Sequence, residues 1–251
     1  MKASRREPAA FADAARRLSN RNLKPIPDGL RSTAVVIFGP PGAGKGTQTQ
    51  KLSDLFSVPR IATGEMIREE VRRRTEFGRR IEKGLAEGQF VDDETIFGML
   101  ERRLRREDLQ RGLLLDGFPR TAPQARQLES VATQFGIEIR AFELKASREV
   151  LIRRLSGRRV CEKCGAVFHQ ESEPPRRENV CDDCGSELSI RDDDSAEVIN
   201  PRLDIHDEAT VPAIRELTQV LMRQGRKVEP IDAEQAPESV TRNLLERLRN
   251  E

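Results

Sequence analysis

A glycine-rich segment with one lysine is the part of the sequence best suited to hold a phosphate. Gly39-Pro-Pro-Gly-Ala-Gly-Lys-Gly-Thr47 follows a continuous apolar run, residues 33–38, and precedes a helix-like segment that extends to about Phe56. Backbone N–H groups of such a loop surround a phosphate, the helix N-terminus adds positive potential, and Lys45 reaches the outer phosphates of a nucleotide. We therefore predict a nucleotide-phosphate site with these contact residues: Gly42, Ala43, Gly44, Lys45, Gly46 and Thr47.

The residue after the lysine differs from the usual phosphate-loop pattern. A Ser or Thr in this place normally holds Mg²⁺, whereas this chain has Gly46 there and Thr47 one residue later. The Mg²⁺ must then be held mainly by nucleotide oxygens, water and another carboxylate. Asp116 is the candidate, because it ends a buried strand at the carboxyl edge, where α/β sheets bind ligands. The alternative is a helix-capping Asp, which the rigid sequence Gly117-Phe-Pro-Arg120 disfavours.

All four cysteines fall in two Cys-x-x-Cys-Gly pairs separated by 16 residues. The surrounding residues 157–195 contain paired prolines and few aliphatic side chains, so they form an inserted module rather than core. Two such pairs can close a tetrahedral thiolate site, and we predict structural Zn²⁺ there, with disulfides or free thiols as the alternative. Metal binding would supply folding free energy that a small core lacks. The predicted ligands are Cys161, Cys164, Cys181 and Cys184.

Taken together, these motifs resemble those of the adenylate kinases among the nucleoside monophosphate kinases. GPPGAGKGTQ, Thr63-Gly-Glu-Met-Ile-Arg68, Asp116-Gly-Phe-Pro-Arg120-Thr and Gly157-Arg-Arg159 occur in the order and approximate spacing of that family. The resemblance covers about residues 33–250. It implies reversible phosphoryl transfer from Mg·ATP to AMP, which gives two ADP, with Mg²⁺ bound to the nucleotide and Zn²⁺ in a long lid.

The resemblance also implies an AMP site. In the family, the position of Arg120 binds the monophosphate, and Thr at the position of Thr63 accompanies adenine acceptors, whereas pyrimidine kinases tend to have a small residue there. Glu65 replaces the family's common Asp, which is a mild change. The implied AMP-binding residues are Thr63, Arg68, Gln89, Phe90, Val91, Gly117, Arg120, Gln124, Arg191 and Arg202.

Phosphoryl transfer needs positive charge around the γ-phosphoryl group, because positioning and charge neutralisation supply most of the acceleration. By resemblance, Arg158, Arg191 and Arg202 match catalytic arginines, Arg154 matches one that packs on the ATP adenine, and Arg159 is a further candidate. The implied catalytic residues are Lys45, Asp116, Arg120, Arg158, Arg191 and Arg202, and ATP binding adds Arg154, Phe168 and Gln235.

Residues of the lid and of the segment after it need separate comment. Arg202 fits least well, because its segment departs from the family's Glu-Thr-Val-x-x-Arg-Leu, and Pro201 predicts that a helix starts or kinks nearby. Phe168 is interpreted, with His169, as lid packing or a nucleotide contact. By resemblance, Asp193 and Asp194 help the closed lid engage the core, and closure over ATP excludes water from the transfer.

The elements that must position these residues alternate between strands and helices. Strands are expected at residues 33–38, 58–61, 113–116, 138–144 and 227–231. This alternation predicts an α/β fold, a P-loop NTPase-type parallel sheet flanked by helices and wound right-handedly, with a small helical acceptor-binding insertion and a zinc-binding lid. The predicted parts are an N-terminal extension (1–32), the core (33–62, 92–156 and 197–251), the monophosphate-binding insertion (63–91) and the lid (157–196).

Composition limits the class of protein. The 251 residues, 36% of them hydrophobic, suffice for the core of one large domain with small insertions. No apolar run approaches the roughly 20 residues of a membrane helix, and four cysteines are too few for a disulfide-stapled secreted scaffold. The N-terminus lacks an apolar signal core, so we expect a cytoplasmic protein with no membrane partner. The family implies a monomer.

Charge and residue usage separate the remaining alternatives. Residues 1–32 hold eight basic and three acidic residues, hence +5 of a total of +2, which leaves −3 for the rest. That balance and the absence of Trp and Tyr disfavour a zinc-knuckle nucleic-acid binder. A UMP/CMP-type kinase is disfavoured by the long cysteine-bearing lid, and a relative without catalysis by the retained Lys45 and Asp116. The extension is interpreted as a tail or a packed helix, since Glu7 and Asp13 fit a transit peptide poorly.

Overall fold

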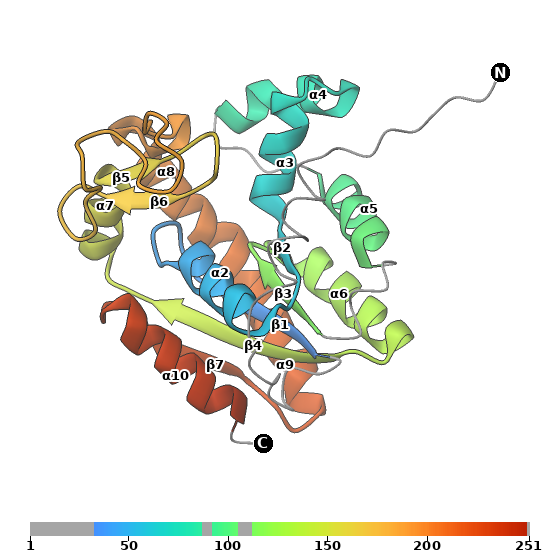
Figure 1. Cartoon of the computed structure of the whole chain (residues 1–251). Coiled ribbons are helices and arrows are strands. Elements are labelled where there is room, and N and C mark those ends of the chain that lie inside the picture. The colour runs from blue at the N-terminus through green and yellow to red at the C-terminus, as the bar shows by residue number, and fades with distance from the viewer. Residues whose placement is uncertain (1–32, 87–91, 105–111, 250–251) are drawn as a thin grey trace.

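The computed structural model describes residues 33–86, 92–104 and 112–249, and the N-terminal extension and Gln89, Phe90 and Val91 lie outside them. A five-stranded parallel sheet in the order β2-β3-β1-β4-β7 forms the centre, with helices on both faces (Figure 1). The predicted α/β class and parallel sheet are confirmed. The sheet strands are β1 (Thr33–Phe38), β2 (Arg60–Ala62), β3 (Leu113–Asp116), β4 (Glu138–Lys145) and β7 (Val228–Asp232).

The helices of the described residues follow the expected order along the chain. They are α2 (Lys45–Phe56), α3 (Thr63–Arg72), α4 (Glu76–Ala86), α5 (Asp93–Leu104), α6 (Ala122–Phe135), α7 (Arg148–Ser156), α8 (Ala196–Ile205), α9 (Val211–Arg223) and α10 (Pro237–Arg249). Thr121 caps α6, because its side-chain oxygen accepts a hydrogen bond from Gln124 N. The prediction that a helix starts near Pro201 is wrong, because α8 already begins at Ala196 and Pro201 lies inside it.

Strand register brings three functional segments to one edge of the sheet. Ile37 of β1 and Ala62 of β2 both pair with Asp116, the last residue of β3. The carboxyl ends of the three strands are therefore level. As a result the loop that begins at Gly39, the helix that begins at Thr63 and the Asp116 carboxylate all emerge at the same edge, where α/β sheets bind their ligands.

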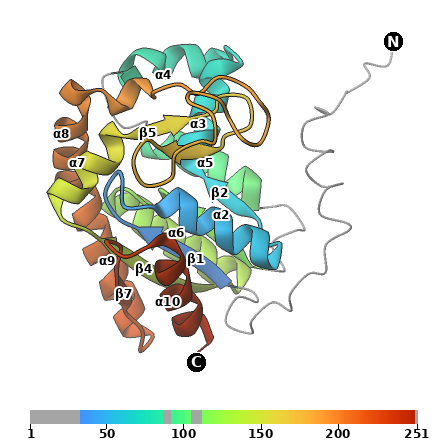
Figure 2. The same ribbon diagram turned by 60° about the vertical axis from the view of Figure 1, so that its left-hand side comes forward.

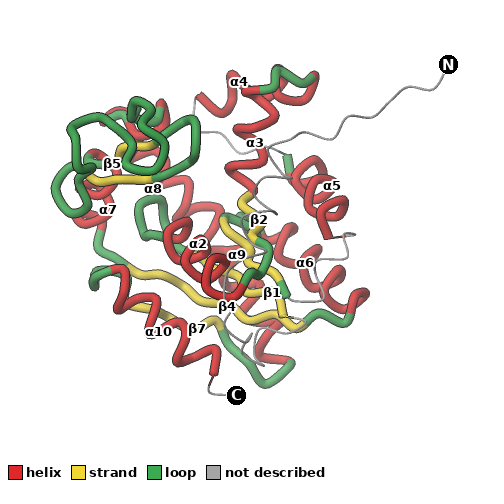
Figure 3. Tube along the Cα trace, viewed as in Figure 1, coloured by secondary structure: helices red, strands yellow, loops and turns green. Residues whose placement is uncertain are grey.

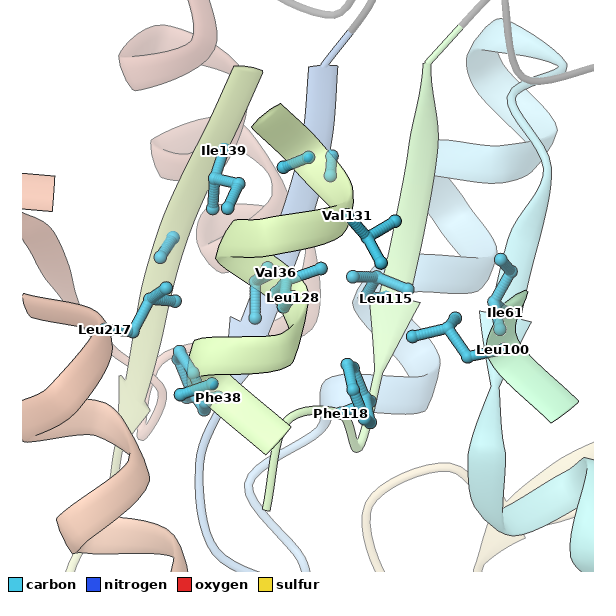
Figure 4. Close-up of a cluster of buried hydrophobic side chains, with 14 of the residues drawn as sticks. Val36, Phe38, Ile61, Leu100, Leu115, Phe118, Leu128, Val131, Ile139 and Leu217 are labelled. Atoms are coloured by element: carbon cyan, nitrogen blue, oxygen red, sulfur yellow. The ribbon is translucent and has the colours of Figure 1, made fainter. Parts of the chain in front are cut away.

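Alternating side chains of β1 divide the core into two layers, one on each face of the sheet. Val36 and Phe38 belong to the layer with α6 and α9, whereas Val35 and Ile37 belong to the layer with α2, α7, α8 and α10. Figure 4 shows the first layer, in which Leu128 of α6 lies over the sheet. Both faces of the central strands are thus covered, as a continuous apolar strand sequence requires.

Two smaller parts extend from the sheet. Helices α3 and α4 follow β2, and a two-stranded sheet of β5 (Arg158–Val160) and β6 (Val167–His169) follows α7. Both views place them at the same end of the molecule, away from α10 (Figures 1 and 2). The segment around β5 and β6 is mostly loop (Figure 3). None of the helices in the described part of the chain has the length and apolarity that a membrane crossing requires.

Candidate active site

The phosphate loop is shaped by glycines that no other residue could replace without strain. Gly39 and Gly42 have positive φ of 143° and 84°. A Cβ at Gly39 would lie 2.8 Å from Leu144 O, and one at Gly42 would lie 3.0 Å from Leu151 O. The loop therefore packs against β4 and α7 on one side, while Gly44 has nothing within 4 Å of its Cβ position. Gly44 is the N-cap residue of α2, so the loop is open at the start of that helix.

Lys45 is held inside this loop by its own backbone. The Lys45 Nζ donates to Gly39 O at 2.7 Å and to Pro40 O at 2.9 Å. Burial lowers the pKa of Lys45 to about 7, with the charges of Arg120, Arg202 and Arg158 adding to the shift and Asp116 opposing it. Three arginines and one carboxylate thus act on Lys45, and this excess of positive charge suits the site to phosphates.

The Asp116 carboxylate lies beside the start of α2. Its Oδ2 accepts from Thr49 Oγ1 at 3.3 Å, and a Cβ at Gly46 would lie 3.5 Å from the same oxygen. Gly46 therefore leaves a space open next to the Asp116 carboxylate. The side chain of the usual Ser or Thr would fill this space. Carboxylate oxygen and water are the ligands that Mg²⁺ prefers, so the residues present fit the Mg²⁺ of a bound nucleotide.

A second group of side chains lies around Gly117. Thr63 Oγ1 and Arg120 Nε donate to Gly117 O at 2.9 and 2.8 Å. The Gln124 side chain accepts from Arg120 N at 2.7 Å and donates to Asp93 Oδ1 at 2.6 Å. The structure thus brings together four of the residues expected in the AMP site.

Arg68 joins the same group from α3. A Cβ at Gly64 would lie 3.3 Å from Arg68 Nη1 and 3.5 Å from Arg120 Nη2, so two guanidinium groups converge on Gly64. Burial lowers the pKa of both arginines, and Arg68 and Arg202 contribute to the shift at Arg120. Closely spaced guanidinium groups that repel one another form a site for an anion.

The remaining predicted arginines are organised by two acidic residues. Asp194, whose side chain is 0% exposed, accepts from Arg158 Nε at 2.7 Å and Nη2 at 2.6 Å, and from Arg202 Nη1 at 2.8 Å. Arg202 Nη2 lies 3.0 Å from Asp193 Oδ2. Burial, with the charges of Arg158 and Arg68, lowers the pKa of Arg191 to about 10. Arg191 therefore remains protonated at neutral pH.

Two of the residues expected to bind ATP, Arg154 and Gln235, interact with the same acidic residue, Asp232. Burial lowers the pKa of Arg154, which Glu234 and Asp232 oppose, and Gln235 donates to Asp232 Oδ2 at 3.0 Å. Arg154 and Gln235 therefore flank the same acidic turn. Phe168 packs in the small core of the lid. Arg159 donates to the carbonyl oxygens of Ser156 and Arg158, and it pairs with Phe168 across β5 and β6.

The four cysteines form one cluster. Their Sγ atoms all lie within 4.8 Å of one another, with 3.4 Å between Cys161 and Cys184 and 3.5 Å between Cys164 and Cys181. Disulfide bonding requires about 2.05 Å, and all four are free. In each pair the following glycine has a positive φ and donates to the carbonyl of the first cysteine, Gly165 to Cys161 and Gly185 to Cys181. This donor set could bind zinc.

Two residues near the site were not predicted from the sequence. Arg60 contacts Asp116 and Glu65. His206 is 8% exposed and lies in a π-helical turn (His206–Thr210), and its Nε2 has no hydrogen-bond partner in the described part of the chain. Burial and the charge of Lys45 lower the pKa of His206. The sequence carried no local signal for His206, because its burial depends on how the π-helical turn packs near Lys45.

Comparison with known proteins agrees with this geometry. The family model for adenylate kinase matches residues 37–220. The chain is 44% identical over 181 residues to an adenylate kinase of Methanosarcina mazei, covering 72% of this chain and 84% of that protein. It is 40% identical over 203 residues to an adenylate kinase of Moorella thermoacetica, covering 80% and 91%. The chain belongs to the adenylate kinase family. It is therefore an enzyme, a phosphotransferase that acts on nucleotides, and the fold and function implied by the motifs are confirmed.

An adenylate kinase of Carboxydothermus hydrogenoformans is similar to the same extent, 44% identical over 179 residues, or 71% of this chain and 84% of that protein. The family match includes the loop around Lys45, the segment from Thr63 to Arg68, Asp116 and the cysteine module. The groups around Lys45, Gly117, Asp194 and the cysteines therefore fall within the matched part of the chain, whereas Asp232, Glu234 and Gln235 lie beyond it.

Proposed function

We propose that this adenylate kinase transfers the γ-phosphoryl group of Mg·ATP to AMP, reversibly, and releases two ADP. The proposal rests on two candidate phosphate sites that both lie close to Arg158 and Arg202. One site is the loop around Lys45, and the other is the guanidinium pair of Arg68 and Arg120. Arg158 and Arg202 lie close enough to both Lys45 and Arg68 to lower the pKa of each. Two phosphorylated substrates would therefore face each other across these arginines.

On the donor side, the loop from Gly42 to Thr47 would hold the ATP phosphates through its N–H groups. Lys45 would leave its contacts with Gly39 O and Pro40 O for the outer phosphates. Asp116 would hold water on Mg²⁺, which supplies neutralisation of the β- and γ-phosphate charge when bound. Arg154, Phe168 and Gln235 would contact the rest of ATP.

On the acceptor side, Arg68 and Arg120 would hold the AMP phosphate, and Thr63, Gly117 and Gln124 would contact the nucleoside. An AMP phosphate oxygen forms a bond to the γ-phosphorus while the bond from that phosphorus to the β-phosphate oxygen breaks, leaving ADP on both sides. The acceptor oxygen carries no proton at neutral pH, so no general base is needed. Arg158, Arg191 and Arg202 would stabilise the charge on the transferred group.

Residues 157–196 would act as a lid with structural Zn²⁺ on Cys161, Cys164, Cys181 and Cys184. Four thiolates leave no open position on the metal, so its contribution is to folding. The lid and residues 63–91 would close over the substrates and exclude water. The acceptor part would include Gln89, Phe90 and Val91. We further expect a cytoplasmic monomer whose partners are the nucleotides alone.

Acceptor selectivity tests the proposal most broadly. AMP is expected to exceed CMP, UMP and GMP by about 10²-fold or more in kcat/KM, because a site built to hydrogen-bond one base rejects others that leave polar groups unpaired. The measurement is a coupled assay of ADP formation with each monophosphate at a fixed ATP concentration. Preference for CMP or UMP would indicate a pyrimidine nucleotide kinase instead. Absence of acceptor-dependent ADP formation would refute both.

The pKa of Lys45 predicts proton uptake when ATP binds. Since burial lowers this pKa to about 7, the free lysine is mostly neutral at pH 8, and phosphates should restore the proton. Nearly one proton per ATP should enter at pH 8, and about half at pH 7. Calorimetry in HEPES and in Tris, which differ in ionisation enthalpy, measures this. Lys45→Arg should abolish the uptake, and Lys51→Met should retain it. Identical heats in both buffers would contradict the prediction.

A further inference from the structure

Arg60 lies among polar groups beside the phosphate loop, on the side where the Asp116 carboxylate lies. It begins β2, and its side chain is 15% exposed. Its Nη1 donates to Gln50 Oε1 at 2.8 Å, and its Nη2 lies 3.3 Å from Asp116 Oδ2. The same Nη2 also forms an ion pair with Glu65 Oε1. One guanidinium group therefore joins two carboxylates that come from different elements, the end of β3 and the first turn of α3.

The place of this guanidinium relative to the loop is set by Gly46. A Cβ at Gly46 would lie 3.5 Å from Asp116 Oδ2 and 3.9 Å from Arg60 Nη2. Arg60 thus borders the same open space as the carboxylate, beside the first turn of α2. The Nε of Arg60 is buried and, within the described residues, has no hydrogen-bond partner. The Nη contacts to Asp116, Glu65 and Gln50 must offset that unsatisfied group.

The net charge of Arg60, Asp116 and Glu65 determines how strongly this group attracts a free divalent cation. Asp116 and Glu65 alone would present two negative charges at one place, a donor set that attracts a divalent cation and repels itself. Arginine stays protonated at all physiological pH values, so Arg60 reduces the net charge of this group from −2 to −1. It also holds the Asp116 carboxylate through Oδ2 at a fixed position next to the loop.

We propose that Arg60 is a positioning residue that prevents Asp116 and Glu65 from binding a free divalent cation, so that the cation enters only with the nucleotide. This inference rests on the proposed role of Asp116 at the nucleotide-bound Mg²⁺. Phosphate oxygens brought by ATP supply the negative charge that Arg60 has cancelled. The Asp116 carboxylate would then orient the cation that arrives with the nucleotide. The site would bind the metal–nucleotide complex more tightly than the bare ion.

Binding of Mn²⁺ to the nucleotide-free enzyme tests the inference without any turnover. Free Mn²⁺ is measured by electron paramagnetic resonance during titration of the zinc-loaded full chain. The wild type should bind weakly, and Arg60→Gln should bind one Mn²⁺ about tenfold more tightly or better, because it restores one unit of negative charge. Arg60→Met provides the same comparison should the Gln variant not fold. Arg60→Lys keeps the charge and should stay close to the wild type.

Two further variants test whether the gain in Mn²⁺ affinity arises at Asp116 and is specific to Arg60. The double variant Arg60→Gln with Asp116→Asn should lose the gained affinity, because it removes the carboxylate that Arg60 covers. Arg148→Gln serves as the matched control, since Arg148 pairs with Asp204 at 2.8 Å away from the site, and its Mn²⁺ affinity should equal that of the wild type. Equal Mn²⁺ affinity in the wild type and in both neutral variants would overturn the proposal. Absence of AMP-dependent ADP formation in the wild type would instead count against the proposed function, and the comparison of Mn²⁺ affinities would remain valid.

Discussion

Replacing Lys45 with Met is expected to lower kcat/KM for ATP by about a thousandfold, a loss of roughly 4 kcal/mol of transition-state stabilisation. The side chain is the one cation anchored within the loop itself, through Gly39 O and Pro40 O. Met has a similar length and fits the same space, so the fold should persist. Steady-state kinetics with ATP and AMP give the rate, and far-ultraviolet circular dichroism checks the fold.

Lys51→Met is the matched control for this experiment. Lys51 lies on the same helix, but its side chain is 34% exposed and pairs with Glu238 at 2.7 Å. Surface pairs of this kind contribute at most about 1 kcal/mol, so activity should be close to that of the wild type. A Lys45→Met enzyme that retains more than about a tenth of the wild-type kcat/KM would remove Lys45 from the proposed transfer.

Loss of the cysteine site is the second large effect. The core of the lid contains Cys161, Cys181 and Leu188, with few partly buried neighbours, so it buries little apolar surface without a metal. Structural zinc sites in small modules contribute about 10–16 kcal/mol to folding. Cys161→Ser should therefore unfold the lid and lower kcat by about tenfold or more, because Arg158 and Arg191 belong to this module. The rest of the α/β core should remain folded.

Two measurements identify this outcome, and one variant serves as their control. Elemental analysis should give about one zinc per chain in the wild type and far less in Cys161→Ser. Trypsin should cleave the variant first between residues 157 and 196. Ser189→Ala is the control within the same module, because it removes hydrogen bonds to Val160 O and Glu162 but no thiol. A metal-free Cys161→Ser enzyme with wild-type activity and protease resistance would show that the lid needs no zinc.

Much of the fold could be predicted because its signals are local. The apolar run that forms β1, the glycines after it and Lys45 are contiguous, so the strand, loop and helix followed directly from their order. Asp116 was placed correctly because a strand that ends in a polar residue brings that residue to the carboxyl edge. The two Cys-x-x-Cys-Gly pairs each fold as a local turn with glycine at positive φ.

Other parts depend on tertiary packing and had no local signal. Arg60 could not be predicted as a site residue, because its partners Gln50 and Asp116 are ten and 56 residues away along the chain. The pairing of both Arg158 and Arg202 with Asp194 likewise appears only when the lid segment and α8 are brought together. The burial of His206 follows from the packing of a π-helical turn near Lys45, which helix periodicity does not anticipate.

Transfer of a labelled phosphoryl group tests the central claim most directly. ATP labelled with ¹⁸O at the γ-phosphoryl group is incubated with unlabelled AMP, Mg²⁺ and the full-length enzyme, and the products are resolved by ³¹P nuclear magnetic resonance. The proposed reaction predicts early appearance of label at the β-phosphate of ADP, at a rate that depends on AMP and is lost in Lys45→Met. Label released mainly as inorganic phosphate, or no label in ADP at saturating AMP, would contradict it.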